Sequence, residues 1–345
     1  MKVYVGMSGG VDSSLTAALL VEAGHDVTGV YMKNWTQDLP GMQCPWAEDL
    51  ADAKRVAVQL GIDFKVFDFE KEYRQNVVDY MIDEYRNGRT PNPDIMCNQE
   101  VKFKLFLEAA LADGAEMIAT GHYARVQDGR LLSAIDQNKD QTYFLYRVTE
   151  QALKKTLFPL GEYNKQRVRE MASERGLYTA SKKDSQGICF VGQIGIKEFL
   201  SQYVETEPGD IINKKTGEKL GRHDGAIFYT LGQRHGLDLG GGLPYYVVGK
   251  DMVRNEVFVT TDLNDESLWR ESLQLASVHW IGDSLTDGDM CEVRVRHRGA
   301  LIPATIHFEG NELCVRLENP ERAVSAGQSV VIYQNGICFG GGVVV

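Results

Sequence analysis

The sequence contains no apolar stretch long enough to cross a bilayer, which needs about 20 consecutive apolar residues. It also lacks a recognisable signal peptide, because the first residues, MKVYVGM, form a strand-like run of β-branched and aromatic residues. We therefore expect a cytoplasmic protein with no membrane partner. The length of 345 residues suggests two or three domains, and 43% apolar with 25% charged residues is ordinary for a globular protein.

Closely spaced cysteines are also absent. The six cysteines, at positions 44, 97, 189, 291, 314 and 338, form no CxxC pair and have no Cys/His spacing typical of zinc sites. We predict no resident metal centre. In a reducing compartment, a scattered cysteine usually serves as a small buried apolar residue. We expect that role for Cys291, Cys314 and Cys338.

Positive charge is scarce. Lysine and arginine number 37 against 48 aspartates and glutamates, giving a formal net charge of −11. This balance argues against a strongly cationic nucleic-acid binder, since phosphate contacts usually come from lysine and arginine. Local basic faces remain possible at 213–223 and 292–298. If the second segment, EVRVRHR, is a strand, Arg294, Arg296 and Arg298 share one face; the alternative is an ordinary solvated sheet face.

The stretch GMSGGVDSS, at 6–14, ends the first strand-like run and opens a helix. Glycines between a strand and a helix let backbone N–H groups turn toward a ligand, and the helix N-terminus favours a phosphate there. A P-loop NTPase would carry a lysine in this loop to reach the β- and γ-phosphates. No lysine follows Val11 and Asp12, which argues against ordinary γ-phosphate transfer. The alternative is a tight turn with Asp12 or Ser13 as the helix N-cap.

The chain reads as an α/β half followed by a β-rich half. In the first half, strand-like runs at 3–7, 27–32, 64–69 and 117–119 alternate with helix-like runs at 13–23, 47–60 and 98–112, and a further helix is expected at 164–175. This alternation predicts a doubly wound parallel sheet with ligands at the carboxyl ends of its strands. From about residue 209, glycine turns separate short runs at 226–231, 245–248, 256–260, 291–296 and 330–333. We interpret these as antiparallel strands in one or two small domains, the last a β-barrel.

The segment TPNPDIMCN, at 90–98, is unusual for a scaffold. Its two prolines predict an extended backbone before a helix that begins near Asn98. Cys97 would then lie beside a helix N-terminus, where the helix dipole lowers a thiol pKa and favours a reactive thiolate. Asp94 is a candidate general acid or base. A lone cysteine near a helix start is nevertheless structural more often than not.

A second cysteine segment, KKDSQGICFVG at 182–192, has polar and glycine residues before Cys189, which suggest a mobile loop. Its lysine pair could stabilise a thiolate or hold a phosphate. A sulfur-transfer or redox pair with Cys97, 92 residues away, would require such a loop. Two unrelated cysteines in unrelated loops are the alternative.

Two further polar segments are TGHYA at 120–124, after a predicted strand, and NKDQ at 138–141. Gly121, at the carboxyl end of a strand, would admit a nucleotide close to the backbone. His122 could bond a substrate or phosphate, although a structural histidine with a satisfied hydrogen bond fits the pattern equally well.

The loop SGGVDSS resembles the signature of the PP-loop ATP pyrophosphatases, which split ATP into AMP and pyrophosphate and usually leave AMP on a substrate oxygen. A larger set of motifs is similar to one family among them, the bacterial tRNA-specific 2-thiouridylases. In chain order these motifs are GMSGGVDSS, GVYMKNW, TPNPDIMCNQEVKF, ATGHYAR, NKDQTYFLY, KKDSQGICFVG and YTLGQRHGL. The similarity continues to GQSVVIY at 327–333, so it covers essentially the whole chain.

The resemblance implies 2-thiolation of the wobble uridine in the tRNAs for lysine, glutamate and glutamine. ATP with Mg2+ would adenylate the C2 oxygen of the base. Cys189 would receive sulfur as a persulfide from a donor protein, either a cysteine desulfurase or a sulfur relay protein, and attack the activated carbon. Cys97 would release the sulfur into the base and leave a Cys97–Cys189 disulfide that a reductant reopens. Asp94 would act as acid or base.

The resemblance also implies binding residues. Those for the nucleotide are Gly6, Met7, Ser8, Gly9, Gly10, Val11, Asp12, Ser13, Met32 and Gly121, with Asp12 placed to help bind Mg2+. Those for the tRNA anticodon stem-loop are Asn92, Pro93 and Asp94 at the target base, and His122, Lys139, Asp140, Gln141, Arg296, His297 and Gln328 elsewhere. His297 departs from the family pattern, in which tyrosine often occupies this position. The implied domains are a catalytic domain at 1–200, a central β-rich domain at 201–270 and a tRNA-contacting barrel at 271–345.

Two other functions remain open from the sequence. A PP-loop amidotransferase or ligase that uses nitrogen on a small molecule would need neither Cys97 nor Cys189. A non-catalytic RNA-binding protein with this fold would release no pyrophosphate from ATP in the presence of tRNA.

Overall fold

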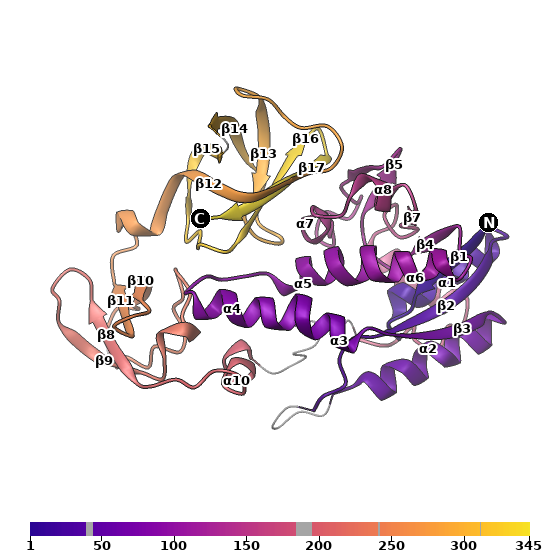
Figure 1. Cartoon of the computed structure of the whole chain (residues 1–345), viewed down its shortest axis with the longest axis horizontal. Coiled ribbons are helices and arrows are strands. Elements are labelled where there is room, and N and C mark those ends of the chain that lie inside the picture. Colours follow the sequence, from indigo (N-terminus) through magenta and orange to yellow (C-terminus); the bar gives the residue numbers. More distant parts are fainter. Residues whose placement is uncertain (39–43, 184–194, 241, 311) are drawn as a thin grey trace.

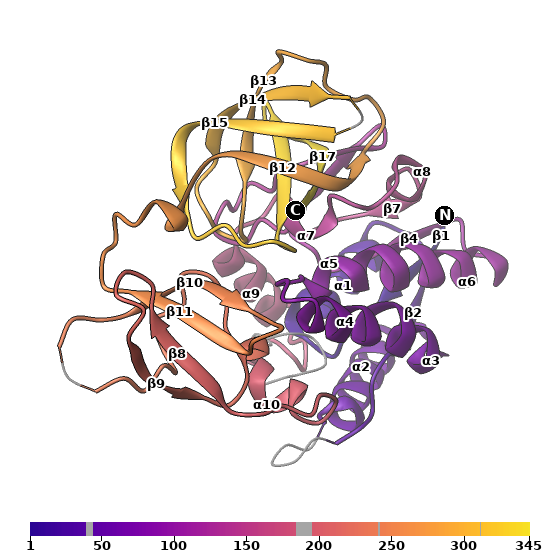
Figure 2. The ribbon, with the colours of Figure 1, turned by 60° about the vertical axis from the view of Figure 1, so that its left-hand side comes forward.

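The computed structural model describes residues 1–38, 44–183, 195–240, 242–310 and 312–345. These residues form three sheets, and Figure 1 shows the parallel sheet near the N-terminus, a smaller middle sheet and a C-terminal barrel. In Figure 2 the barrel again lies above the two other regions. The predicted fold class is confirmed: a doubly wound α/β domain, then a β-rich domain and a β-barrel. Among the described residues, no helix is long and apolar enough to cross a membrane.

Five parallel strands form the first sheet, in the order β3-β2-β1-β4-β7. Their bounds are β1 Lys2–Gly6, β2 Asp26–Lys33, β3 Asp63–Asp68, β4 Met117–Ala119 and β7 Thr156–Leu157. β1 pairs with β2 on one side and with β4 on the other, so the strand order reverses between β1 and β4. In open α/β sheets, ligands bind at this reversal, beyond the carboxyl ends of the strands.

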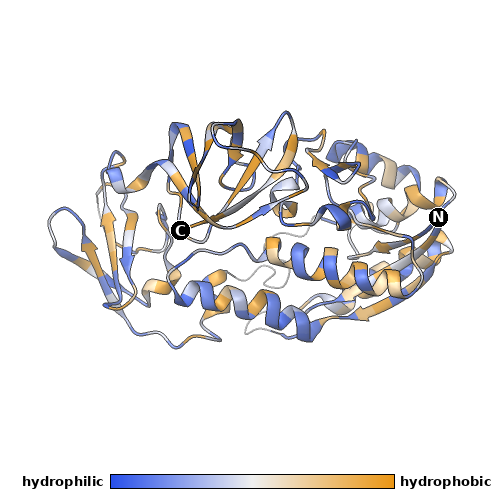
Figure 3. Ribbon diagram, turned by 45° about the horizontal axis from the view of Figure 1, so that its top comes forward, coloured by the Kyte–Doolittle hydropathy of each residue, from blue (hydrophilic) through white to orange (hydrophobic). Residues whose placement is uncertain are grey.

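Helices cover both faces of this sheet. Val3 and Val5 of β1 pack with α1 (Val11–Glu22) and α2 (Trp46–Leu60), whereas Tyr4 between them packs on the opposite face. Successive side chains of a strand point to opposite faces, so a strand covered on both faces is apolar along most of its length. Figure 3 shows these strands as mostly apolar and the helices around them as banded in apolar and polar residues.

Two long helical rods lie side by side over the Tyr4 face (Figure 1). The first rod consists of α3 Glu70–Tyr73, the π-helical turns η1 Arg74–Asp79 and α4 Tyr80–Arg86. The second consists of α5 Pro93–Met96, the π-helical turns η2 Cys97–Leu105 and α6 Phe106–Ala112. The remaining helices of the N-terminal half are α7 Thr142–Leu145, α8 Glu150–Leu153, α9 Lys165–Glu174 and α10 Ile196–Leu200.

The second rod begins five residues earlier than the sequence pattern indicates. Asn92 is the N-cap, and its side-chain oxygen accepts hydrogen bonds from the backbone N–H groups of Asp94 and Ile95 at 3.1 and 3.4 Å. Pro93 occupies the first helical position, where a proline loses no hydrogen bond. The prediction of an extended backbone before Asn98 is therefore wrong. Cys97 lies in the second turn, beyond the first turn in which the helix dipole acts most strongly.

The middle sheet has the strand order β10-β11-β8-β9. It is a mixed sheet because β11 pairs with β8 in parallel, so the prediction of antiparallel strands is wrong for this pair. Its strands are β8 Gly209–Asn213, β9 Lys219–His223, β10 Tyr246–Asp251 and β11 Glu256–Thr260. The predicted strand at 226–231 is wrong, because Ala226–Phe228 forms a 3-10 helix, η3. All three of its residues are buried, so the apolar run reflects complete burial and not the alternation of a strand.

The C-terminal strands close into a six-stranded barrel because β12 pairs with both β15 and β17. The strands are β12 Trp269–Trp280, preceded by the 3-10 helix η4 Glu266–Leu268, then β13 Met290–Arg294, β14 Ile302–Glu309, β15 Glu312–Arg322, β16 Ser329–Gln334 and β17 Ile337–Val344. A hairpin of the N-terminal half, β5 Arg125–Gln127 and β6 Arg130–Leu132, extends the sheet of the barrel by pairing with β17.

The predicted arginine face does not form. β13 ends at Arg294, and Arg298 has a left-handed backbone with φ of 60°. Arg294 is buried, and its guanidinium pairs with Asp140 at 3.0 Å, where the carboxylate is fully buried. The alternating sequence pattern extends beyond the end of the strand, so it does not place the three arginines on one face. Of the three, Arg296 and Arg298 are exposed.

The buried Asp140–Arg294 pair joins the barrel to the α/β domain. Asp140 also accepts hydrogen bonds from the backbone N–H groups of Ala134 and Thr142 and from the Thr142 hydroxyl, so its oxygens are fully used. Beside it, the Tyr143 hydroxyl donates to the Ser329 carbonyl at 3.0 Å. Segment 139–146 is thereby fixed against the barrel.

We predict that Asp140→Asn lowers the free energy of unfolding by about 3–5 kcal/mol, because it leaves the Arg294 charge buried without a counter-charge. The control is Asp83→Asn, which removes the exposed Asp83–Arg86 pair and should cost less than about 1 kcal/mol. Urea denaturation followed by circular dichroism measures both. Equal losses in the two variants would contradict the assignment of Asp140 as the buried link.

Candidate active site

The loop between β1 and α1 presents backbone N–H groups without a side-chain cap. Gly10 is the N-cap of α1, with φ of −96° and ψ of 167°, so the alternative of Asp12 or Ser13 as N-cap is wrong. The Ser13 hydroxyl instead accepts a hydrogen bond from the backbone N–H of Ser8 at 3.1 Å and donates one to the Gly10 carbonyl at 3.2 Å. These bonds hold the loop closed while the first N–H groups of α1 remain available to an anion.

Glycine is required at two places around this loop. Gly9 has φ of 73°, and a Cβ there would lie 2.4 Å from the carbonyl oxygen of Asp49 at the start of α2. Gly121, just after β4, packs against the start of α1, where a Cβ would lie 2.8 Å from the backbone N of Ser13. Both contacts are with backbone atoms that side-chain rotation cannot move.

The residues predicted to bind a nucleotide therefore meet at the reversal of the strand order. A Cβ at Gly6 would lie 2.9 Å from the terminal methyl of Met32, which places the end of β2 beside the loop. Gly121, which follows β4, packs against the start of α1 and so places the end of β4 beside the loop as well. Met7 and Val11 are buried in the core below the loop.

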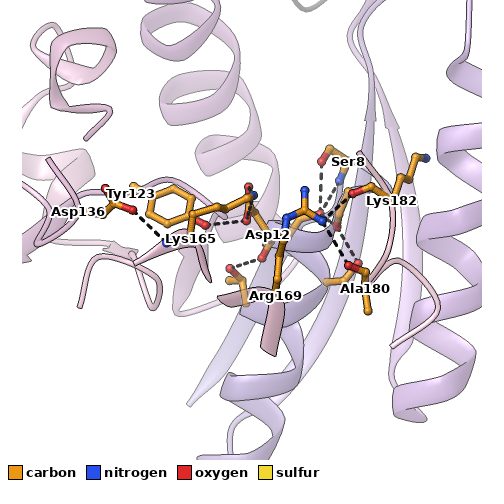
Figure 4. A network of polar contacts seen from close by, with 12 residues as sticks. Ser8, Asp12, Tyr123, Asp136, Lys165, Arg169, Ala180 and Lys182 are labelled. Atoms are coloured by element: carbon orange, nitrogen blue, oxygen red, sulfur yellow. Dashed lines mark hydrogen bonds and ion pairs between the residues drawn. The ribbon is translucent and has the colours of Figure 1, made fainter. Parts of the chain in front are cut away.

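Asp12 is bonded to two groups from other parts of the chain. The Tyr123 hydroxyl donates to its carboxylate at 2.8 Å, and the Lys165 ammonium lies 2.7 and 2.8 Å from its two oxygens (Figure 4). Lys165 is the first residue of α9, after the N-cap Asn164. A lysine is thus present at the loop, but it comes from 153 residues further along the chain. No local pattern could have indicated it.

A second cation of α9 holds the segment that leads toward Cys189. Arg169 donates to the carbonyl oxygens of Ala180 and Lys182 at 3.3 and 3.0 Å. The Lys182 ammonium bonds the carboxylates of Asp49 and Asp52 at 2.8 and 2.7 Å. Lys182 therefore anchors this segment to α2. The contact of the lysine pair with a thiolate or phosphate stays a prediction. Cys189 itself lies outside the described residues.

The start of the second rod meets segment 139–146 and the barrel. Cys97 is 1% exposed. Next to it, the Asn98 amide donates to the Phe144 carbonyl at 3.1 Å. The backbone N–H of Thr90 donates to Ala326 of the barrel at 2.8 Å. Asn92, Pro93 and Asp94 of the predicted base-binding set begin the rod at this junction.

Three of the predicted tRNA-binding residues belong to the barrel. The His297 ring packs on Phe144, with ring centroids 4.4 Å apart. Gln328 accepts a hydrogen bond from the backbone N–H of Ser325 at 2.9 Å. Arg296 is exposed and bonds Glu321 at 2.6 Å. A surface that includes parts of both domains is therefore assembled around the start of the rod.

Segment 139–141 has a structural role in this arrangement. Gln141 accepts a hydrogen bond from the backbone N–H of Tyr123 at 2.9 Å and donates its own backbone N–H to the Tyr123 carbonyl. The Asp140 carboxylate forms a buried ion pair with Arg294, so it binds the barrel and is not available to a ligand. Lys139 is half-buried at the start of the segment.

His122 is a buried histidine with a satisfied hydrogen bond. Its Nδ1 lies 2.8 Å from the Thr120 hydroxyl, and its ring packs between Phe103 and Phe158. Burial, with a smaller contribution from Lys102, lowers the pKa of His122 well below its ordinary value, so the ring is neutral at pH 7. The structural interpretation left open by the sequence is the one that these contacts support.

The other cysteines behave largely as expected. Cys291 and Cys338 are buried, whereas Cys314 is half-buried. Burial raises the pKa of Cys291 to about 12, so its thiol is protonated at neutral pH. Among the described residues, no group of three or more His, Cys, Asp and Glu side chains could hold a metal ion.

A glycine-rich, lysine-free loop at the strand-order reversal of a parallel α/β sheet defines a PP-loop nucleotide-binding enzyme, a class whose fold implies ATP binding. Comparison with known families gives three matches along the chain. Residues 1–193 match a family model described as a tRNA methyl transferase HUP domain. Residues 197–261 match the tRNA methyl transferase PRC-barrel domain, and residues 270–344 match the aminomethyltransferase beta-barrel domain.

Curated relatives define the family more narrowly. The tRNA-specific 2-thiouridylase MnmA of Bacillus licheniformis is 48% identical, over 99% of this chain and 94% of the relative. The proteins of the same name from Bacillus subtilis and Listeria monocytogenes serotype 4a are both 47% identical, over 99% and 100% of this chain and 94% of each relative. The chain belongs to the family of tRNA-specific 2-thiouridylases, which are sulfurtransferase enzymes.

Among solved structures, one similar structure is a 4-thiouridine synthetase–RNA complex with bound ATP. The match covers 58% of this chain and 50% of the synthetase chain, with 19% identity and a TM-score of 0.39. This likeness is too distant to refine the assignment.

We predict that Gly121→Ala weakens ATP binding at least tenfold, because its Cβ would displace the backbone at Ser13. Gly240→Ala is the control, since nothing lies within 4 Å of the added Cβ. Isothermal titration with Mg-ATP measures both variants. Unchanged affinity in a correctly folded Gly121→Ala protein would show that the close approach is not needed for the nucleotide.

We predict that His297 lowers the free energy of unfolding at acidic pH relative to neutral pH. Burial, followed by the charges of Arg298 and Arg294, lowers the pKa of His297 to about 4, below the unfolded value of about 6.5. The unfolded chain therefore binds this proton first, and stability is lost as the pH falls from 6.5 toward 4.

His297→Tyr should consequently lose less stability between pH 7 and pH 4.5 than the unchanged protein. Urea denaturation midpoints at the two pH values measure the difference. His235→Tyr, at an exposed position, is the control and should behave like the unchanged protein. The prediction fails if His297→Tyr and the unchanged protein lose equal stability.

Proposed function

We propose that this enzyme forms 2-thiouridine at the wobble position of the tRNAs for lysine, glutamate and glutamine, with ATP and a cysteine persulfide. The observation that carries the proposal is the assembly of a PP-loop, Met32 and Gly121 at one edge of the sheet, in a chain whose full-length relatives are tRNA-specific 2-thiouridylases.

ATP would bind with its phosphates on residues 6–13 and its adenosine beside Met32 and Gly121. The loop lacks the lysine that assists γ-phosphate transfer, which suits attack at the α-phosphorus with pyrophosphate as the leaving group. Mg2+ suits the carboxylate of Asp12, since this ion usually binds one or two carboxylates together with substrate phosphates. When bound, it would neutralise charge on the departing pyrophosphate.

The sulfur chemistry would proceed in two displacements. The terminal persulfide sulfur of Cys189 attacks C2 of the adenylated base, and AMP departs with the former C2 oxygen. The Cys97 thiolate then attacks Sγ of Cys189, which breaks the sulfur–sulfur bond, leaves sulfur on C2 and forms the Cys97–Cys189 disulfide. A thiol reductant restores both cysteines. Asp94, at the start of the rod that carries Cys97, would move the proton.

The tRNA would bind through its anticodon stem-loop at the junction of the rod and the barrel. Asn92, Pro93 and Asp94 would face the target base, and Lys139, Gln141, Arg296, His297 and Gln328 would contact the flanking RNA. The acidic net charge favours this local mode of binding, with marked salt dependence, over a broad basic groove.

Nucleoside mass spectrometry tests the proposal. Unmodified glutamate tRNA is incubated with the protein, Mg-ATP, a cysteine desulfurase, any required sulfur relay and cysteine. We expect 2-thiouridine with the unchanged protein, none with Cys189→Ser, and a loss of at least a hundredfold with Cys97→Ser. Cys314→Ser, on the barrel, should retain full activity.

A glutamate tRNA with cytidine at the wobble position should give no thiolated product. If complete sulfur-donating mixtures release pyrophosphate but form no thiolated base, the proposed cleavage of ATP stands. The proposed transfer of sulfur to the tRNA base is then rejected. Full activity of Cys189→Ser would reject the persulfide mechanism.

A further inference from the structure

Helix α9 presents two cations toward the PP-loop. Lys165 and Arg169 are four residues apart, so they lie on the same face of the helix. Figure 4 shows Lys165 with Tyr123 at the Asp12 carboxylate, and the Arg169 guanidinium between the loop and the segment of Ala180 and Lys182. α9 packs directly on α1 through the cluster that contains Leu15, Val168 and Met171. The position of Lys165 is therefore fixed by the core.

The charge balance at the loop explains why a cation is needed there. Asp12 is the acidic residue in the first turn of α1, close to where a polyphosphate would bind. Without a compensating charge, its carboxylate would repel the phosphates. The Lys165 ammonium is within 2.8 Å of both Asp12 oxygens, and its side chain is only 13% exposed. Charge interactions are stronger at such a site than in bulk water.

We propose that Lys165 is the polyphosphate-binding cation of this PP-loop. In the structure its ammonium neutralises Asp12. With ATP bound, Asp12 would help to hold Mg2+, and the Lys165 ammonium would contact the β- and γ-phosphates, which leave together as pyrophosphate. Lys165 thus supplies, from a distant helix, the charge that P-loop NTPases place within the loop itself. This inference rests on the proposed use of ATP and adds a residue to it.

The contacts distinguish this role from that of the neighbouring cations. Lys182 is held by two carboxylates of α2, and Arg169 donates to the backbone carbonyls of Ala180 and Lys182. Arg167, also on α9, pairs with Glu174 at 2.7 Å on the exposed side of the helix. It offers a matched control on the same helix.

Isothermal titration with Mg-ATP, magnesium pyrophosphate and AMP tests the inference on the full-length protein without tRNA. We expect Lys165→Met to weaken the binding of ATP and pyrophosphate at least tenfold and that of AMP less than twofold. Lys165→Arg should retain most of the affinity because it keeps the charge. Arg167→Met should bind all three like the unchanged protein.

A double variant separates a direct contact from mere support of Asp12. Without Mg2+, Asp12→Asn should bind pyrophosphate at least as tightly as the unchanged protein, and adding Lys165→Met should weaken it at least tenfold. If Lys165 acts only by holding Asp12, the second substitution will have no further effect, which would overturn the inference. Equal weakening of AMP and ATP by Lys165→Met would also overturn it.

The outcomes for the unchanged protein keep the two proposals apart. If it binds neither ATP nor pyrophosphate, the proposed ATP chemistry fails and the inference fails with it. If it binds both and a folded Lys165→Met protein binds them equally well, the inference alone is wrong.

Discussion

The buried ion pair between Asp140 and Arg294 fixes the barrel on the α/β domain, and the geometry of the candidate active site depends on it. Asp140 belongs to a segment that also reaches the nucleotide loop, because Gln141 bonds the backbone of Tyr123 and the Tyr123 hydroxyl bonds Asp12. The barrel surface, the segment and the PP-loop are thereby held at defined positions. The proposed adenylation would require such precision, since a base oxygen would have to approach the α-phosphorus in line with its leaving group.

This arrangement places the start of the Cys97 segment and the nucleotide loop, which come from distant parts of the sequence, around one sheet. The rod that carries Cys97 starts at the junction with the barrel and runs back along the sheet that carries the PP-loop. Cys97 is almost fully buried, so its thiol reacts only when its surroundings open. In the proposed mechanism, this burial would protect the thiol until the base and the persulfide are in place.

Much of the fold and part of the site could be predicted from local pattern. The parallel sheet followed from strand-like runs that alternate with helix-like runs, and the nucleotide loop followed from glycines at a strand end. Other features depend on contacts between distant residues. Lys165 reaches Asp12 across 153 positions, and Arg294 turns inward because Asp140 is buried beneath the barrel. The early start of the rod at Pro93 was signalled locally by the Asn92–Pro93 cap, but two prolines suggested an extended chain instead.

In the proposed reaction, the oxygen at C2 of the wobble uridine leaves as part of AMP. The most direct measurement uses tRNA with oxygen-18 at C2 of that uridine, a complete sulfur-donating mixture and mass spectrometry of the AMP produced. We expect one oxygen-18 in each AMP formed with 2-thiouridine. AMP without the label, accompanied by thiolated tRNA, would contradict adenylation of the base.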